Sequence, residues 1–318
     1  MGLNSVDFGW AGIERVVVRV HAVCDDLLCY TLRVNICRFK SNDGVVRIGL
    51  VAADSTVQDL TPAGITQLQP LLEDDDPVAR LGRLVHGDLP RWPQAQVRLC
   101  APVERQEVWA AGVTYLRSKK ARMEESQFSA NAYDRVYEAE RPELFFKSLP
   151  EKVAATGEPV GIRHDAKWSV PEPELGLVVN SRGRIVGHTI GNDMSSRDIE
   201  GENLLYLPQA KTYNRSCALG PWITLGVSEV AAREWMIKLH IRRAGGIVFA
   251  GETSVSQIKR GFDELVGFLF RCQVFPNGAV LLTGTGIVPQ DSFTLCEKDE
   301  IDIEITGIGG LKNTVAVV

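Results

Sequence analysis

Apolar and polar residues alternate over short stretches along most of this chain, a spacing that predicts β-strands. Strands at 34–39 and 45–51 flank a Ser-Asn-Asp-Gly turn, which is typical of a hairpin. Further strands are predicted at 108–113, 144–147, 236–242, 247–250, 279–283, 292–295 and 301–306. Helical spacing predicts fewer elements, at 65–73, 78–86 and 254–270. Since strands and helices do not alternate regularly, we expect an α+β, mainly β fold rather than a Rossmann fold or a TIM barrel.

The segment 168–198 predicts a further hairpin that carries three carboxylates. Two apolar strands flank turn residues at 180–183. Glu172 and Glu174 are two residues apart, so on a strand their side chains share a face. If residues 182 and 183 form a two-residue turn, Asp193 lies directly opposite Glu172. The hairpin then brings three acidic side chains together.

Three carboxylates this close repel one another unless a cation lies between them. Oxygen ligands favour a hard divalent ion, so the hairpin predicts a site for Mg²⁺, with Mn²⁺ or Ca²⁺ as alternatives. The prediction depends on register, because a slip of one residue moves Asp193 to the other face. An ordinary solvated strand is the competing interpretation, and the acids that alternate with isoleucine at 300–305 are an example of it.

Two later positions add candidate chemistry to this site. Lys211 lies in an apolar stretch, Leu-Pro-Gln-Ala-Lys, and is either a surface lysine or a base. Beside a divalent cation its pKa would be lowered, so that it could remove a proton from carbon next to a carbonyl. Thr285 lies in a Thr-Gly-Thr-Gly turn that either connects two segments or holds a carboxylate through backbone N–H groups. The turn lacks the third glycine of a dinucleotide fingerprint, so we do not expect a nicotinamide cofactor.

Composition limits the classes of partner and compartment. The 318 residues carry a formal net charge of −5, which argues against nucleic acid or an anionic membrane as the partner. The seven cysteines are odd in number and include no Cys-x-x-Cys pair. We therefore expect free thiols and a cytoplasmic protein. Residues 1–30 lack the basic start and unbroken apolar run of a signal peptide.

Four separated motifs resemble the fumarylacetoacetate hydrolase family. They are Glu-Pro-Glu-Leu at 172–175, the Asn-Asp segment at 187–198, Lys211 and the Thr-Gly-Thr-Gly turn at 283–286, in that order. The resemblance implies that Glu172, Glu174 and Asp193 hold the metal, while the lysine and Thr285 face the substrate. It also implies a mixed β-roll catalytic domain at 103–318 after a small N-terminal domain at 31–102, with 1–30 as an extension of uncertain order. Such proteins are usually dimeric, so we expect a homodimer or a higher homo-oligomer.

The departures from the family pattern narrow the expected chemistry. Hydrolytic members tend to carry a His and a Glu that activate water, where this chain has Ser118 and Ala121. The Gly-Val-Thr-Tyr-Leu-Arg-Ser segment at 112–118 and the Leu-Tyr-Leu-Pro-Gln-Ala-Lys segment at 205–211 are instead similar to the 2-keto-3-deoxyarabinonate dehydratase-like branch. This branch consists of lyases in sugar acid catabolism.

The dehydratase resemblance implies a reaction in which Mg²⁺ holds a 2-keto-3-deoxy sugar acid through its carboxylate and keto oxygens. Lys211 would remove a C3 proton to give a metal-stabilised enolate, and the C4 hydroxyl would leave as water. The product from a pentonate would be 2,5-dioxopentanoate. The proton donor to the leaving group stays open among Glu124, Glu125 and a water held by the metal or by Ser118.

Arg117, Ser118 and Thr285 are the candidate substrate contacts. Two alternatives stay open. A hydrolase of a 2,4-diketo acid such as an acylpyruvate would cleave a C–C bond in the same scaffold, with a water-activating base from the segment 116–139. A non-catalytic binding protein is the third hypothesis, and the intact set of acids and lysine argues against it.

Overall fold

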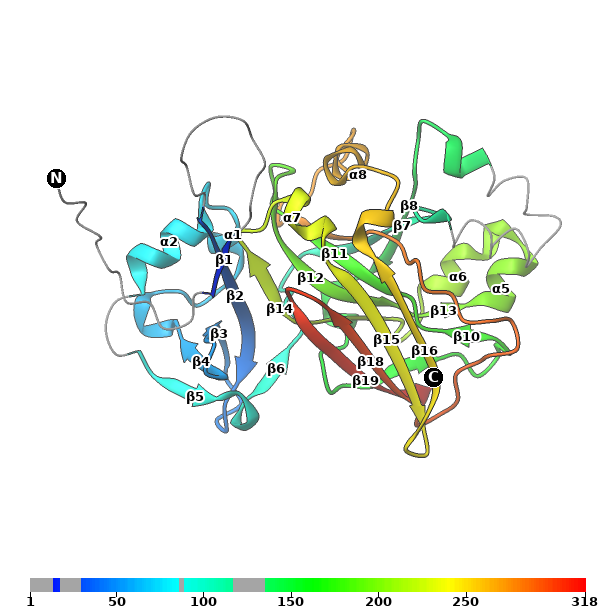
Figure 1. Ribbon diagram of the computed structural model, residues 1–318, viewed down its shortest axis with the longest axis horizontal. Coiled ribbons are helices and arrows are strands. Elements are labelled where there is room, and N and C mark those ends of the chain that lie inside the picture. Colours follow the sequence, from blue (N-terminus) through cyan, green and yellow to red (C-terminus); the bar gives the residue numbers. More distant parts are fainter. Residues whose placement is uncertain (1–13, 18–29, 86–88, 117–134) are drawn as a thin grey trace.

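The computed structural model describes residues 14–17, 30–85, 89–116 and 135–318 of the chain (Figure 1). Within them strands predominate, which confirms the expected α+β, mainly β class. The strands are β1 Glu14–Val17, β2 Tyr30–Lys40, β3 Val46–Val51, β4 Thr56–Asp59, β5 Arg91–Pro93, β6 Arg98–Cys100, β7 Glu107–Gly112, β8 Glu143–Ser148, β9 Val160–Ile162, β10 Ser169–Val170, β11 Pro173–Val179, β12 Ile185–Asp193, β13 Ser195–Ser196, β14 Cys217–Leu225, β15 Met236–Arg243, β16 Gly246–Ser254, β17 Ala279–Leu282, β18 Glu300–Ile305 and β19 Gly309–Val317.

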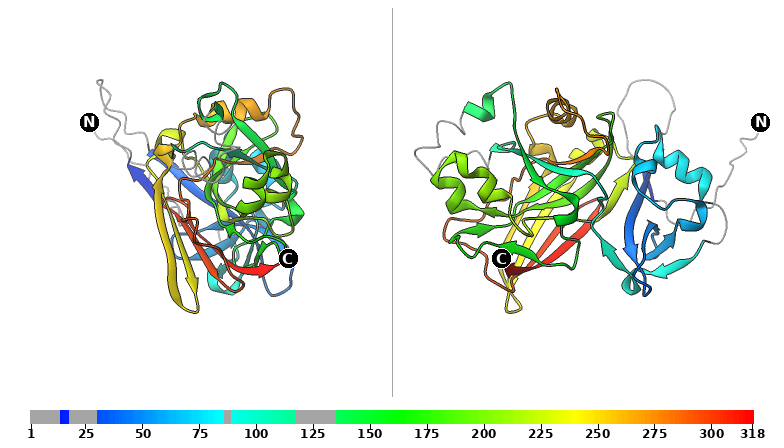
Figure 2. Two further views of the ribbon diagram at one scale, coloured as in Figure 1. Left: turned by 90° about the vertical axis from the view of Figure 1, so that its right-hand side faces the viewer. Right: turned by 180° about the vertical axis from the view of Figure 1, so that it is seen from behind.

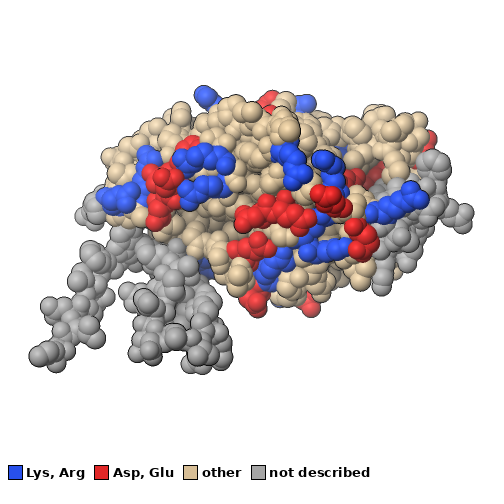
Figure 3. All heavy atoms as spheres, turned by 90° about the horizontal axis from the view of Figure 1, so that it is seen from above, with Lys and Arg blue, Asp and Glu red and all other residues tan. Residues whose placement is uncertain are grey.

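The helices are short. They are α1 Gln69–Leu72, α2 Pro77–Leu84, α5 Arg197–Glu202, α6 Leu207–Lys211, α7 Glu229–Arg233 and α8 Phe262–Leu269. No helix of the described part is long and apolar enough to cross a membrane. On the face seen in Figure 3, lysine and arginine are interspersed with aspartate and glutamate.

Two sheets form the main layers. The larger sheet has the strand order β5-β4-β3-β2-β14-β12-β11-β17-β7-β8, with β1 and β6 also paired to β2. The smaller sheet has the order β16-β15-β18-β19-β9 and packs across β11 and β12 (Figures 1 and 2). A two-stranded pair, β10-β13, lies near α5 and α6. The predicted hairpin β11–β12 is therefore at the centre of the larger sheet, covered by the smaller one.

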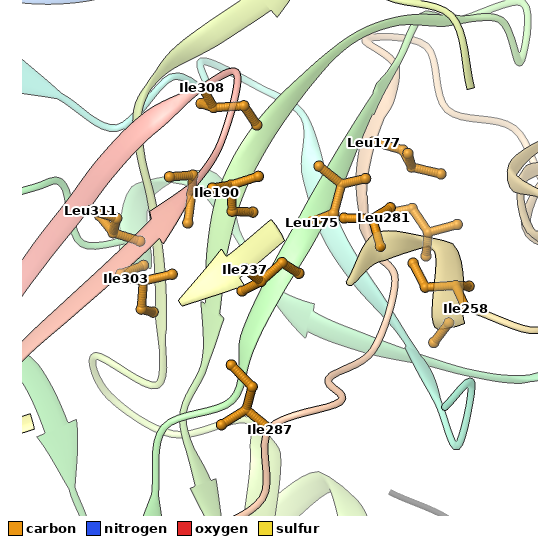
Figure 4. Packing of buried hydrophobic residues seen from close by; sticks show 14 of the residues in the cluster. Leu175, Leu177, Ile190, Ile237, Ile258, Leu281, Ile287, Ile303, Ile308 and Leu311 are labelled. Carbon is orange, nitrogen blue, oxygen red and sulfur yellow. The ribbon is translucent and has the colours of Figure 1, made fainter. Parts of the chain in front are cut away.

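The apolar core between the two sheets explains why β11 reads as a nearly continuous apolar run. Leu175 and Leu177 belong to the same buried cluster as Ile237 of β15 and Ile303 of β18 (Figure 4). Val178, on the opposite face, belongs to a second buried cluster. Both faces of the strand are thus removed from water, which is typical of a strand at the centre of a sheet.

The boundary expected at residue 102 falls in the loop between β6 and β7. The larger sheet continues across it, because β2 pairs with β14 through Ile36 and Ile223. The second buried cluster also contains residues from both sides of this boundary, such as Ile48 and Val280. The division into domains at 31–102 and 103–318 stays a prediction, and most of 1–30 lies outside the described residues.

Two predicted elements are wrong. The segment 254–270 does not form one helix, because β16 extends to Ser254, a 3₁₀ turn follows at Val255–Gln257, and α8 starts only after an extended Gly261. The apolar residues of this segment belong to the 3₁₀ turn and to α8, and both elements bury them in the same core. Residues 292–295 form a coil instead of a strand, and within it Leu295 N–H bonds to the Ser169 carbonyl.

Candidate metal and active site

The register of β11 and β12 places the acidic residues together. Pro173 pairs with Asn192 and Glu174 with Gly191. The Asp193 N–H donates to the Glu172 carbonyl oxygen at 2.9 Å. Asp193 therefore lies opposite Glu172, as predicted.

The turn that connects the strands differs from the predicted two-residue turn. The Asn180 N–H bonds to the Arg184 carbonyl at 3.0 Å, so three residues form the loop, and Gly183 has φ +76°. The Asn180 side chain stabilises this longer loop by accepting from the N–H groups of Arg182 and Arg184, each at 3.1 Å. The longer loop shifts the pairing of β11 with β12 by one residue. A β-bulge, in which Val186 has no partner on β11, shifts the pairing back.

Glu172, Glu174 and Asp193 form a buried group whose carboxylate oxygens all lie within 4.8 Å of one another. Their exposed fractions are 4%, 1% and 1%. Burial raises the pKa of Glu174 well above its usual value, and the charges of Asp193 and Glu172 raise it further. A divalent cation would relieve this cost. An all-oxygen donor set of this kind fits Mg²⁺, Mn²⁺ or Ca²⁺.

Lys211, at the end of α6, lies against this acidic triad. Its Nζ donates to Glu172 Oε2 and Asp193 Oδ2, both at 2.9 Å, and to Ser195 Oγ at 2.6 Å. The side chain is 2% exposed, so the interpretation of Lys211 as a surface lysine is wrong. An amine here is positioned to exchange a proton with a ligand held at the carboxylates.

Sequence reasoning missed two further cations. Lys147 of β8 places its Nζ 2.5 Å from Asp193 Oδ1 and also donates to the carbonyl oxygens of Met194 and Lys211. Arg197, at the start of α5, lies 3.1 Å from Glu172 Oε1. A lysine at the end of the apolar run 144–147 was the available signal for Lys147. Three cations thus surround the three carboxylates.

The glycine turn after β17 binds the triad directly. The Gly284 N–H donates to Glu174 Oε2 at 2.6 Å, so this backbone group holds a carboxylate of the protein itself. The Thr285 hydroxyl accepts from the Ile287 N–H at 3.2 Å. Thr285 lines the same pocket as the triad.

This pocket brings together residues from seven separate stretches of the chain. Its lining comprises Ala111, Gly112, Val113, Glu143, Phe145, Glu172, Glu174, Asp193, Glu200, Lys211, Gly284 and Thr285. Glu143 and Glu200 add two carboxyl groups that sequence reasoning did not select. The predicted residues Arg117, Ser118, Glu124 and Glu125 lie outside the described residues.

The fold and the pocket define a β-rich protein with a buried, oxygen-only cation site and a lysine beside it. Residues 107–316 match the sequence profile of the family described as fumarylacetoacetate (FAA) hydrolase C-terminal. The chain belongs to the fumarylacetoacetate hydrolase family.

Individual relatives within the family narrow the comparison to one kind of enzyme. The chain is 48% identical over 217 residues to a probable 2-keto-3-deoxyxylonate dehydratase of Haloferax volcanii. The aligned region covers 68% of this chain and 74% of the relative. It is 38% identical over 218 residues to the 2-dehydro-3-deoxy-D-arabinonate dehydratase of Saccharolobus solfataricus, covering 68% and 73%. A solved 2-keto-3-deoxy-D-arabinonate dehydratase, complexed with magnesium and 2,5-dioxopentanoate, superposes with a TM-score of 0.73 at 31% identity, over 89% of this chain and 99% of that one.

Proposed function

We propose that this protein is a Mg²⁺-dependent dehydratase, a hydro-lyase that converts a 2-keto-3-deoxypentonate into 2,5-dioxopentanoate. The observation that carries the proposal is the position of Lys211, whose Nζ lies 2.9 Å from carboxylate oxygens of both Glu172 and Asp193. The names of its relatives, which are dehydratases of 2-keto-3-deoxy pentonates, support the same chemistry.

Glu172, Glu174 and Asp193 would hold the cation. Bound there, Mg²⁺ would polarise the keto group of a 2-keto acid and so acidify the neighbouring C3–H bond. The Gly284 N–H holds the Glu174 carboxylate by a 2.6 Å hydrogen bond, and the Arg197 guanidinium holds the Glu172 carboxylate in the same way. These bonds keep the carboxylates in one geometry while substrate and product exchange.

Lys211 is the residue that we assign to proton removal at C3. The C3–H bonding electrons form the C2–C3 double bond of an enol, and the C4–O bond then breaks as C3 and C4 become doubly bonded. The C4 hydroxyl leaves as water once it has received a proton. Because the C2–C3 electrons have moved to C3–C4, the C2 keto group re-forms and the species left is a 5-hydroxy-2-oxo-3-enoate. Loss of a proton from C5 and gain of one at C3 then give a C4–C5 enol, which tautomerises to the 2,5-dioxo acid.

The proton for the leaving hydroxyl needs a carboxyl group or a water in the pocket. Glu143 and Glu200 line the pocket and are the described candidates outside the triad. Glu124, Glu125 and a water held by Ser118 or by the cation complete the set, and Arg117 and Thr285 are proposed substrate contacts. Separate Glu→Gln variants at 124, 125, 143 and 200 distinguish the donors. Deprotonation of the donor lowers the rate at high pH, so only loss of the donor removes this basic limb of the pH–rate profile.

The test is a product assay with a matched pair of substrates. Purified protein and Mg²⁺ are incubated with 2-keto-3-deoxypentonate or with an acylpyruvate, and 2,5-dioxopentanoate and pyruvate are measured. We expect only the first product, its loss in EDTA, and its return with Mg²⁺. The variants Glu174→Gln and Lys211→Met should each abolish turnover. Pyruvate release from the acylpyruvate, without dehydration of the pentonate, would instead establish the hydrolase.

We further propose that the protein is a homodimer that forms through β16. This strand is at the edge of the smaller sheet, and its Ile247 and Val248 are 57% and 44% exposed. An apolar edge strand presents backbone groups to a second strand, and two copies can pair antiparallel about a two-fold axis. Ile247→Lys should then yield a monomer in light scattering, whereas Val274→Lys, at an 80% exposed position elsewhere, should not.

We propose a cytoplasmic location because the described cysteines carry free thiols. The cysteines of the described residues, Cys37, Cys100, Cys217, Cys272 and Cys296, are all free. Free thiols persist in a reducing compartment. Cell fractionation with antibody detection tests this, and recovery in an extracellular or periplasmic fraction would contradict it.

A further inference from the structure

One wall of the pocket contains a backbone conformation that a valine rarely adopts. Val113 has φ +53° and is 8% exposed. The described part has five other non-glycine residues with positive φ, namely Ser55, Arg215, Ala244, Cys272 and Lys298. Val113 is the β-branched one, and in this region of φ a β-branched side chain clashes with its own backbone. Such strain persists where the surrounding structure imposes it, and it gathers at functional sites.

The residues on both sides of Val113 show how the conformation is imposed. Before it, Ala111 pairs with Leu144 in the sheet. After it, the Thr114 hydroxyl donates to the Thr283 carbonyl at 2.6 Å, and the Thr114 carbonyl accepts from the Lys259 N–H at 3.1 Å. The chain must therefore turn within one residue, between a strand and a doubly anchored threonine.

Two glycines near Val113 have no room for a Cβ atom, so they contribute only backbone to this part of the pocket wall. A Cβ at Gly112 would lie 2.0 Å from Glu143 Oε2, and a Cβ at Gly284 would lie 2.1 Å from Thr114 Oγ1. Both glycines line the pocket without a side chain. Val113 lines the same pocket as the triad and, unlike these two glycines, has a side chain.

We propose that Val113 is a specificity-determining residue that limits the length of the substrate chain. The inference rests on the proposed function. With its carboxylate end at the triad, a 2-keto-3-deoxy acid extends its far end toward the wall of the pocket. The valine accepts a five-carbon acid there and opposes a six-carbon acid. The strained backbone holds the branched side chain in that position.

The experiment compares kcat/KM for 2-keto-3-deoxypentonate and 2-keto-3-deoxyhexonate in wild type, Val113→Ala and Val113→Gly. Removing the two methyl groups should raise the hexonate-to-pentonate ratio about tenfold in both variants, the effect of about one methylene-sized difference in a pocket. Val113→Gly should also melt at a higher temperature than Val113→Ala, because glycine accepts positive φ without strain. Ala244→Gly, at φ +50° in the β15–β16 turn, is the control: it should leave the ratio unchanged.

The outcomes separate the two proposals. A wild-type protein that dehydrates neither acid refutes the proposed function. A wild-type protein that dehydrates the pentonate, with an unchanged ratio in both Val113 variants, refutes the role of Val113 and leaves the function intact. A ratio that rises equally in Ala244→Gly would show that general loosening, and not the pocket wall, changes the selectivity.

Discussion

Replacing Lys147 with methionine tests how the charges of the site are balanced. Lys147 is fully buried, and its Nζ lies 2.5 Å from Asp193 Oδ1. It also donates to the carbonyl oxygens of Met194 and Lys211, so it links the end of β12 to the end of α6. Methionine keeps most of the side-chain volume and removes the charge and its donors. The variant therefore leaves packing nearly intact while it removes a cation from the triad.

The magnitude follows from the burial of both partners. Asp193 is 1% exposed, so water cannot replace the lost ammonium group. Removing one partner of a buried ion pair costs about 3–5 kcal/mol, chiefly because the other charge stays buried. Stabilities of single proteins are about 5–15 kcal/mol, so the variant should fold but be much less stable. Added Mg²⁺ should reduce the loss, because a cation at the triad compensates Asp193.

The assay is urea unfolding in EDTA, followed by the fluorescence of the six tryptophans. Lys312→Met is the matched control, because Lys312 pairs with Asp302 at 3.1 Å but is 71% exposed. An exposed pair of this kind contributes at most about 1 kcal/mol. If Lys147→Met loses no more stability than Lys312→Met, the buried pair does not stabilise the site and the reasoning is wrong. The double variant Lys147→Met/Asp193→Asn should recover part of the loss.

Three other predictions concern pH, backbone and metal. Burial lowers the pKa of His188 to about 4, below its usual 6.5, so protonation favours the unfolded chain. Stability should fall by about 2 kcal/mol between pH 7 and pH 5, and His188→Phe should remove that loss in urea titrations; an unchanged pH dependence would contradict it. Gly284→Ala should lower the melting temperature by several degrees, because its Cβ would meet Thr114 Oγ1 at 2.1 Å at φ +88°; a melting temperature equal to wild type would refute this. Glu174→Gln should weaken Mn²⁺ binding at least about tenfold in paramagnetic resonance titrations, and unaltered affinity would exclude Glu174 as a ligand.

The alternation of apolar and polar residues predicted most strands, because it shows which side chains of a segment are buried and which are exposed. It could not predict which strands become neighbours. β17 pairs in parallel with β7, and some 170 residues of chain separate Leu281 from its partner Trp109. The same limit explains the errors at 254–270 and 292–295. An apolar spacing shows that side chains are buried, but tertiary contacts decide whether a helix, a turn or a coil buries them.

The grouping of the three carboxylates in the candidate site was predictable because they share one hairpin, whereas residues that converge on it from distant segments were not predictable. Glu172, Glu174 and Asp193 come from one hairpin, so their spacing was informative. Lys147 joins them from β8, and its place at the end of an apolar run was a signal too weak to connect it with the distant hairpin. A lysine becomes part of a metal centre only when burial removes water and leaves carboxylates as its partners.

The register shows that a correct prediction can come from two cancelling errors. A two-residue turn and an unbroken ladder would place Asp193 opposite Glu172, and so do a three-residue loop and one bulge. The energy that selects this register does not come from the turn. It comes from the face of β12, where a slip of one residue would move Ile190 out of the core and Asp193 into it. The loop and the bulge at Val186 are then the local adjustments that the core and the acidic triad require. Deleting Val186 should therefore disrupt the metal site more than exchanging residues of the loop.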